Sequence, residues 1–348
     1  MSITIKSISI HGFRNLANVE ALKLTSLNVL IGGNGTGKST LLHFFEMLRC
    51  VSREDKFHEY VLSNGGGNDQ CFMGGQVTPL IRATMVAATE RGDYEYDLQL
   101  KYFPAGDRLS VEKSEWRVLT DAEHAEKLTA AEENDFLEQL EVFHFHDTSV
   151  HSAVNKYWDV ADTYCLRPDG GNLAPVLLSL KQKDPLRYKY IVRQIQRVFP
   201  TLDDFVLKEE YGKVLLKWKN RYSDKTIGAY LTSDGTLRLF FLMTLLNMAE
   251  DRLPSVLMID EPELGLHPHA VELVAAMIRR VSYSKQVLVA TQSPQLVDAF
   301  DPENVIIASA SQGAAQFERV PKKVYQRWLD EDYTLSDMWL SRPVGGVL

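Results

Sequence analysis

One short stretch restricts the folds open to this chain more than any other feature. Residues 27–31 are an apolar run, and Gly32 to Thr40 follow as Gly-Gly-Asn-Gly-Thr-Gly-Lys-Ser-Thr. The segment 41–48 is again rich in Leu and Phe. This order predicts a strand, a glycine-rich loop and a helix, and it meets the pattern G-x-x-x-x-G-K-[ST] from Gly32 to Ser39. The alternative is a glycine-rich turn with a chance lysine, but the flanking strand and helix favour the motif.

A loop of this kind binds phosphate. Its glycines allow backbone N–H groups to converge on phosphate oxygens at the positive end of a helix dipole. Lys38 is predicted to reach the β- and γ-phosphates, and the Ser39 hydroxyl to hold Mg²⁺. The stretch is therefore predicted to be a nucleoside-triphosphate site, formed by Gly32, Asn34, Gly35, Thr36, Gly37, Lys38, Ser39 and Thr40.

Composition is that of an ordinary globular protein. The 348 residues are 45% hydrophobic and 24% charged, with a net charge of −8, which argues against a wholly basic nucleic-acid binder. The N-terminus lacks the basic and apolar regions of a secretory signal, and the richest apolar run, 237–248, is too short to span a bilayer. Three cysteines without C-x-x-C spacing suggest neither a disulfide framework nor a zinc site. We expect a cytoplasmic protein with no membrane segment.

The first third of the chain has strand-like patterns. Strands are expected over residues 3–10 and 19–24, with a turn at Phe13 to Leu16 between them. Three further runs with turn residues between them predict an antiparallel meander, over residues 77–88, 94–102 and 109–119.

The remainder predicts an α/β fold. Helices are expected over 121–140, 173–180 and 185–198, followed by a hairpin around Gly212 with strands 205–210 and 213–218. In the last third, apolar strands alternate with helices, which predicts a mostly parallel sheet wrapped by helices. Its predicted strands are 256–259, 287–290 and 305–308, and its helices 270–281 and 294–299. We expect an N-terminal ATPase lobe over 1–120, a mainly helical insert over 121–230 and a C-terminal ATPase lobe over 231–348.

A second candidate element follows the apolar strand that begins at Val256. The strand ends in Asp260 and Glu261, followed by Pro262. In P-loop enzymes the first acid supports Mg²⁺, and an adjacent acid can polarise the water that attacks the γ-phosphate. The alternative is a surface turn, because Asp-Glu-Pro is common loop chemistry.

These motifs together resemble a known family. The P-loop, the segment Ile259-Asp260-Glu261-Pro262-Glu263-Leu264-Gly265-Leu266-His267-Pro268 and the segment Thr291-Gln292-Ser293-Pro294 occur in this order. They resemble the ATPase heads of the RecF, SMC and overcoming-lysogenization-defect group, within the ABC-type ATPases. Phe13-Arg14-Asn15-Leu16 resembles the group's N-terminal motif, and residues 231–238 resemble its signature motif. The resemblance covers nearly the whole chain, although residues 50–230 match only loosely.

The resemblance implies a head-to-tail dimer that traps two ATP molecules. Each ATP would lie between the P-loop of one subunit, with Arg14 and Asn15 nearby, and the Ser233-Asp234-Gly235 turn of the other. This turn precedes an apolar helix, whose N-terminus is an anion site. The alternative is an ordinary N-cap that satisfies only its own helix.

Two positions depart from the family pattern. Gln292 stands where these heads usually have histidine; it can orient water but cannot titrate, so we expect slow turnover. The family also has a Q-loop glutamine that serves as a metal ligand, and the candidate for it here is Gln76, after Gly74-Gly75.

Two further patterns have ordinary explanations. His144 and His146 alternate, but a metal site needs three or four ligands and the sequence shows no convincing partner, so structural histidines are expected. Lys189, Arg193 and Arg197 form a stripe that could follow DNA or RNA phosphates or could be a solvated helix face.

The sequence thus favours an ATP-hydrolysing switch of RecF/SMC type, with catalytic Glu261 and Gln292 and with ATP and Mg²⁺ as cofactors. It would work as a homodimer or higher even oligomer in DNA maintenance or phage defence. There is no long heptad segment for a coiled-coil arm, and the tail after Ala308 is short for a fused nuclease domain of ordinary size. We therefore expect a separate effector, a nuclease or another protein. The alternatives are the ATPase subunit of a membrane transporter, and an ATP sensor with little hydrolysis.

Overall fold

The computed structural model describes residues 3–119, 127–319 and 333–340. Its contacts divide the chain into two compact units. The first unit consists of Met1–Val142, Pro254–Met258 and Lys285–Leu348, and the second of Phe143–Leu253 and Ile259–Ser284. Each unit is therefore assembled from separate stretches, whereas the three-part division expected from the sequence follows chain order.

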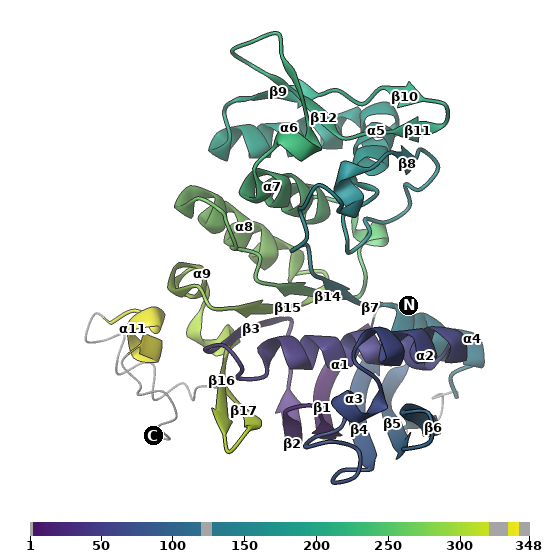
Figure 1. The fold of residues 1–348 in the computed structure, drawn as a ribbon. Coiled ribbons are helices and arrows are strands. Elements are labelled where there is room, and N and C mark those ends of the chain that lie inside the picture. Colours follow the sequence, from purple (N-terminus) through teal and green to yellow (C-terminus); the bar gives the residue numbers. More distant parts are fainter. Residues whose placement is uncertain (1–2, 120–126, 320–332, 341–348) are drawn as a thin grey trace. The chain divides into compact units, whose positions relative to one another are not determined.

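An antiparallel sheet forms one part of the first unit (Figure 1). Its strand order is β2-β1-β4-β5-β6, so the predicted meander is confirmed and the two N-terminal strands extend it. A tight turn joins β1 to β2: Phe13 pairs with Leu16, and Arg14 has a left-handed φ of 45°. The strands are β1 (Ile3–Phe13), β2 (Leu16–Lys23), β4 (Leu80–Thr89), β5 (Gly92–Phe103) and β6 (Arg108–Val118).

A second sheet has six strands in the order β17-β16-β3-β15-β14-β7. Strand β3 pairs in parallel with both β15 and β16, and β17 pairs antiparallel with β16. Every residue of β3, β14 and β15 is buried, as expected for the central strands of a covered parallel sheet. The predicted α/β fold is thus confirmed. The strands are β3 (Leu27–Ile31), β7 (Leu140–Phe143), β14 (Val256–Asp260), β15 (Gln286–Thr291), β16 (Val305–Ser311) and β17 (Ala314–Arg319).

Helix α1 (Lys38–Val51) belongs to the core that joins these sheets. Its buried face includes Leu41, Leu42, Phe44 and Phe45, and the same cluster contains buried residues of both sheets. Because α1 is buried on both sides, the loop before it has a fixed support. The unit also contains α2 (Glu54–Ser63), α3 (Gly67–Gln70), α4 (Ala130–Glu138), α9 (Pro294–Asp298) and α11 (Leu335–Leu340).

Helix α4 corrects one sequence expectation. The segment 121–140 was expected to be a single helix, but α4 covers only Ala130–Glu138 and the chain continues at once into β7; residues 120–126 lie outside the described residues. A capping box at Thr129 fixes the start of α4, because its side chain accepts from the amide of Glu132 and the Glu132 carboxylate accepts from the amide of Thr129.

In the second unit, the described residues form four α-helices. They are α5 (Leu173–Lys183), α6 (Pro185–Val198), α7 (Asp234–Leu245) and α8 (Pro268–Val281). Two small antiparallel sheets accompany them, with the orders β10-β11-β8 and β13-β12-β9. Their strands are β8 (Trp158–Asp159), β9 (Leu202–Phe205), β10 (Glu209–Glu210), β11 (Lys213–Val214), β12 (Lys217–Asn220) and β13 (Thr226–Gly228).

The predicted hairpin around Gly212 is correct at its turn and wrong in its length. Only β10 and β11 pair across Tyr211 and Gly212, whereas β12 leaves the hairpin and pairs with β9 and β13. The two-residue strands are too short to produce a period, so the sequence could not separate the two sheets.

Candidate nucleotide site

The predicted P-loop joins β3 to α1 in the first unit. Gly35 and Gly37 have φ values of 77° and 98°, a left-handed conformation that favours glycine. A Cβ at Gly37 would lie 2.4 Å from the Cβ of Ala315, and one at Gly32 would lie 2.3 Å from the carbonyl oxygen of Ala308. Two of the motif's glycines are therefore required by close packing against β16 and β17, and a third by its backbone conformation.

Lys38 occupies the first position of α1 and points back over its own loop. Its side chain is buried, and Nζ donates to the carbonyl oxygens of Gly32 (2.7 Å) and Gly33 (2.9 Å). Gly33 to Gly35 are exposed, and no side chain caps the first turn of α1. The loop thus combines an oriented ammonium group with helix N-terminal amides, which is the arrangement that binds phosphate. Ser39 and Thr40 follow within the same turn and are partly buried.

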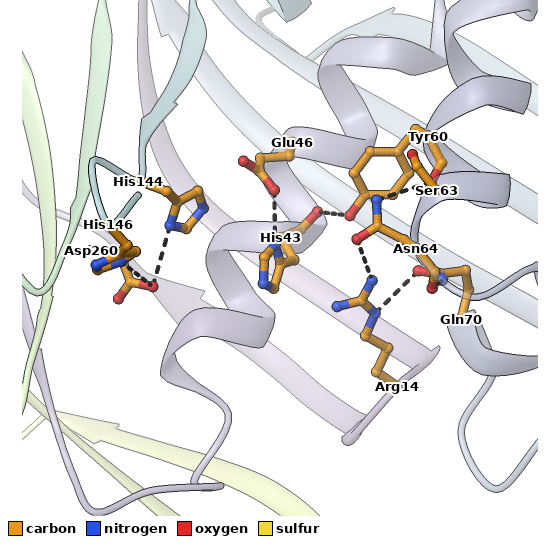
Figure 2. Close-up of polar contacts among 10 residues, drawn as sticks. All are labelled: Arg14, His43, Glu46, Tyr60, Ser63, Asn64, Gln70, His144, His146 and Asp260. Carbon is orange, nitrogen blue, oxygen red and sulfur yellow. Dashed lines mark hydrogen bonds and ion pairs between the residues drawn. The ribbon is translucent and has the colours of Figure 1, made fainter. Parts of the chain in front are cut away.

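In the Phe13–Leu16 turn, Arg14 and Asn15 have different partners. The Asn15 amide donates to the carbonyl oxygen of Gly35 (3.1 Å), and the Asn15 carbonyl accepts from the amide of Ala315 (2.8 Å). Arg14 points to Gln70 Oε1 (3.1 Å) and Asn64 Oδ1 (3.2 Å), as Figure 2 shows. Of the two predicted residues, Asn15 is therefore the one that contacts the P-loop, and the guanidinium of Arg14 braces the chain around α3.

Gln292 follows β15, the strand next to β3. The register pairs Thr291 with Ile31 in parallel, so Gln292 leaves β15 at the level at which Gly32 leaves β3. The turn after it is held locally: Thr291 Oγ1 accepts from the amide of Ser293, and Ser293 Oγ accepts from the amide of Leu296. Parallel pairing therefore brings two predicted site residues to one edge of the sheet.

Gln76 lies elsewhere in the first unit. It is exposed in the loop that leads into β4 of the antiparallel sheet. Its role as a metal ligand stays a prediction.

In the second unit, Asp260 and Glu261 stand at the end of β14. Asp260 is 8% exposed, and Pro262 is buried, so this segment is not a plain surface turn. Glu261 has a left-handed φ of 46°, a conformation that costs a residue with a Cβ roughly 1–2 kcal/mol. The carbonyl of Glu261 accepts from the amide of Leu264 (3.1 Å), which closes the turn that holds it. A strained acid directly after a buried one is typical of functional sites.

The Ser233-Asp234-Gly235 turn begins α7. Ser233 is the N-cap by position, but its side chain makes no capping bond; its hydroxyl lies 2.8 Å from Thr236 Oγ1. Ser233 and Asp234 are exposed. A Cβ at Gly235 would lie 2.0 Å from the carbonyl oxygen of Gly265, so glycine is required where this turn meets the loop after Glu261.

Arg238, a residue with no predicted role, binds two backbone segments of the second unit. Its guanidinium donates to the carbonyl oxygens of Phe145 (3.2 Å), His146 (2.9 Å) and Leu264 (3.1 Å). Arg238 therefore positions the loop after Asp260 and the segment that carries His144 and His146. In the sequence, its place in the signature-like motif was the one feature that could have indicated this role.

The structure also changes the interpretation of the two histidines. Their predicted lack of a partner is wrong, because His144 Nδ1 lies 3.3 Å and His146 Nε2 lies 3.9 Å from Asp260 Oδ2 (Figure 2). No local pattern could reveal this contact, since the residues are far apart in the chain.

The basic stripe lies on α6 as predicted. Lys189, Arg193 and Arg197 are exposed, and Ile191 and Ile195 are buried on the opposite face. Arg197 donates to Gln194 (2.9 Å) on its own helix.

Comparison with protein families identifies the chain. A family model described as "AAA domain, putative AbiEii toxin, Type IV TA system" matches residues 27–298. The chain belongs to this family. No curated protein matched the chain.

Solved structures share the fold of this family member. An SmcHead bound to the C-winged helix domain of ScpA has a TM-score of 0.60 at 14% identity and covers 93% of this chain and 99% of its own. A Pyrococcus furiosus Smc head with an extended coiled coil, bound to the C-terminal domain of ScpA, gives 0.60 at 14%, with 95% and 99% covered. The SMC head domain from Thermotoga maritima gives 0.51 at 14%, with 91% and 99% covered. The chain thus has the fold of an SMC head domain.

Across the described parts of the chain, none of the helices has both the length and the apolar character needed to cross a membrane.

Proposed function

We propose that this protein binds and hydrolyses ATP as a RecF/SMC-type switch that dimerises around two ATP molecules. The observation that carries the proposal is the strand–loop–helix at Gly32 to Thr40, with a left-handed Gly37 and a buried Lys38 directed over the loop. The proposed phosphate ligands are the loop amides and Lys38.

Mg²⁺ fits the donors that the motifs supply. It prefers oxygen ligands and usually takes one or two carboxylates with substrate phosphates, which the Ser39 hydroxyl and the Asp260 carboxylate match. The ion would neutralise charge that develops on the phosphates. Glu261 is the proposed general base, because its strained turn fixes the carboxylate for a water. Gln292 is the proposed second catalytic residue and would orient that water.

Exposure around the Ser233 turn supports dimerisation. Tyr230 is 53% and Leu231 is 69% exposed, next to the exposed Ser233 and Asp234. Exposed apolar side chains beside an uncapped helix N-terminus are suited to an interface that also binds an anion. We therefore propose that Ser233, Asp234 and Gly235 contact the ATP of a second copy.

The comparisons with known proteins bear on the biological role and on the effector. The family's description names a putative toxin of a type IV toxin–antitoxin system, which is compatible with phage defence. Two of the similar heads are complexes with ScpA domains, which supports a separate partner protein for this chain. DNA maintenance remains the other proposed setting.

The Glu261→Gln variant tests the switch. It keeps the shape of the side chain but removes the base, so ATP should still bind while hydrolysis falls about 100- to 10,000-fold. Light scattering after gel filtration should show a dimer with ATP and a monomer without it. Glu272→Gln on α8, where the glutamate is exposed, is the matched control and should hydrolyse normally. Normal hydrolysis by Glu261→Gln would show that Glu261 is not the general base. A Glu261→Gln protein that binds ATP but stays monomeric would contradict the proposed ATP-dependent dimer.

One observation favours a second candidate, an ATP sensor with little hydrolysis. Gln292 stands at the edge of the sheet beside the P-loop and cannot exchange a proton. The sensor predicts a wild-type dimer that persists with ATP for as long as that of Glu261→Gln. The switch predicts that the wild-type dimer dissociates as ATP is consumed.

The stripe on α6 is the proposed nucleic-acid contact. Replacing Lys189, Arg193 and Arg197 together with Gln should weaken DNA binding and lower the slope of log K against log salt by about 0.9 per lost phosphate contact. Lys208, Lys213 and Lys225 are exposed in the same unit, and their triple Gln variant changes the net charge equally. Equal losses in both variants would indicate a general charge effect, and no loss would leave the stripe as solvated surface.

A further inference from the structure

The cluster of His144, His146 and Asp260 lies within the second unit and has the composition of a metal site. The two histidines follow β7 and are separated by one residue, and a tight turn brings the amide of His146 to the carbonyl of His144 (2.9 Å). Their ring centroids are 6.0 Å apart. Asp260, at the end of β14, completes the set.

This histidine segment is held firmly from two sides. Between the histidines, the Phe145 ring stacks on Phe241 of α7, with centroids 4.4 Å apart and planes only 8° from parallel. Arg238 donates to the backbone carbonyls of Phe145 and His146. A Cβ at Gly170 would lie 2.3 Å from the Phe145 ring, so the chain closes over it. Both imidazoles therefore have a fixed backbone, as ligands of a preformed site require.

The distances suit a metal ion. With metal–ligand bonds of about 2.0–2.2 Å, neighbouring ligand atoms of a tetrahedral site are about 3.4 Å apart. His144 Nδ1 and His146 Nε2 lie 3.3 and 3.9 Å from Asp260 Oδ2, and all three ligand atoms lie within 4.8 Å of one another.

The donor set indicates the class of ion. Imidazole ligands suit zinc, copper, iron and nickel, whereas Mg²⁺ is bound through oxygen. Two imidazoles and one carboxylate leave one position of a tetrahedral ion open.

We propose that His144, His146 and Asp260 bind a divalent transition-metal ion of the Zn²⁺ type, and that this ion competes with Mg²⁺ for the Asp260 carboxylate. The competition rests on the proposed ATPase function, because there Asp260 serves Mg²⁺. Binding itself does not depend on it and is measured without nucleotide.

Binding is tested by titrating the nucleotide-free protein with Zn²⁺ in a calorimeter and with Co²⁺ under visible absorption. The wild type should take up one ion per chain, with the intense absorption of four-coordinate Co²⁺. His144→Asn/His146→Asn and Asp260→Asn should each bind at least about tenfold more weakly. The control is His267→Asn/His269→Asn, which removes an equally spaced pair with ring centroids 5.5 Å apart.

The outcomes separate the metal site from an alternative role, in which the histidines only orient the Asp260 carboxylate by hydrogen bonds. That role predicts equal metal affinity for the wild type and all variants. Loss in the control as great as in the site variant would likewise overturn the proposal. Lys38→Ala should keep Zn²⁺ binding while its ATP affinity falls, so failure of the nucleotide site and failure of the metal site are distinguishable.

A measurement on the wild type remains decisive if a variant does not fold. Histidine modification with diethyl pyrocarbonate, mapped by mass spectrometry, should be slowed by Zn²⁺ at His144 and His146 and not at His267 or His269. Equal rates with and without Zn²⁺ at the first pair would overturn the site. In the wild-type protein, Zn²⁺ should also raise the Mg²⁺ concentration needed for half-maximal ATP hydrolysis. If Zn²⁺ leaves this Mg²⁺ concentration unchanged, the two ions do not compete for Asp260.

Discussion

The turns before α1 and α7 both contain glycine and start their helices without a side-chain cap, and they are built differently. The P-loop before α1 is fixed by its own unit, through Ala308, Ala315, Asn15 and the bonds of Lys38 to the loop carbonyls. The turn before α7 fixes its glycine against Gly265 but leaves Ser233 and Asp234 exposed. The contacts that fix the first turn come from its own unit, whereas the second turn leaves two polar side chains exposed.

A missing side-chain cap indicates a binding site only when the surroundings of the helix N-terminus support one. Helices α2 and α5 also begin without a capping side chain, and neither carries a phosphate motif. The P-loop has a buried ammonium group that donates to its own carbonyl oxygens, and the Ser233 turn has exposed apolar neighbours. We therefore expect substitutions in the P-loop to act on ATP affinity, and those in the Ser233 turn to act on pairing of copies.

The largest effect is expected from Lys38→Ala. A charge-assisted hydrogen bond is worth about 1.5–3 kcal/mol, so ATP affinity should fall roughly 10- to 150-fold, measured by calorimetry. Lys56→Ala on α2, which removes an exposed lysine of the same unit, should bind ATP as the wild type does. Equal affinities for the two variants would show that the loop is not the phosphate site and would remove the basis of the comparison.

A smaller effect, on stability, separates the glycines that packing requires from those it does not. Gly235→Ala places a Cβ 2.0 Å from a backbone oxygen, and overpacking of this kind typically costs about 1–3 kcal/mol. Gly33→Ala meets nothing within 4 Å and should leave the unfolding midpoint in urea unchanged. A stable Gly235→Ala would mean that the turn can move away from Gly265 and that its geometry is not fixed.

The sequence alone was enough to predict the elements that contain a motif or a regular hydrophobic period. The strand Leu27–Ile31, the helix from Lys38 and the helix Pro185–Val198 all lie where the sequence places them, because a glycine loop or an Asp-Pro start marks their ends. The parallel sheet was predictable for the same reason, since short apolar strands alternate with helices. Functional roles of the individual site residues stay predictions.

Contacts between residues far apart in the chain could not be predicted from the sequence. The meeting of His144 and His146 with Asp260, and the three carbonyls that Arg238 holds, depend on how β7, α7 and β14 come together, and no short-range pattern encodes them. The strands β8 to β13 are two to four residues long and too short for a period to be recognised. Arg14 illustrates a different limit, because a motif gives a residue's position but not the neighbour that its side chain selects.

The smallest change in stability provides the sharpest test of the Ser233 turn. If Ser233 were an ordinary N-cap, Ser233→Ala would cost about 1 kcal/mol of unfolding free energy. Because its hydroxyl bonds Thr236 and not a helix amide, we expect a change within about 0.5 kcal/mol, together with a weaker ATP-dependent dimer in the Glu261→Gln background. Thr129→Ala removes a side chain that does cap α4 and should cost the full 1 kcal/mol or so without affecting the dimer. If Ser233→Ala loses stability and still forms the dimer, the Ser233 turn is an ordinary structural cap. It would then differ from the P-loop only in how it is packed.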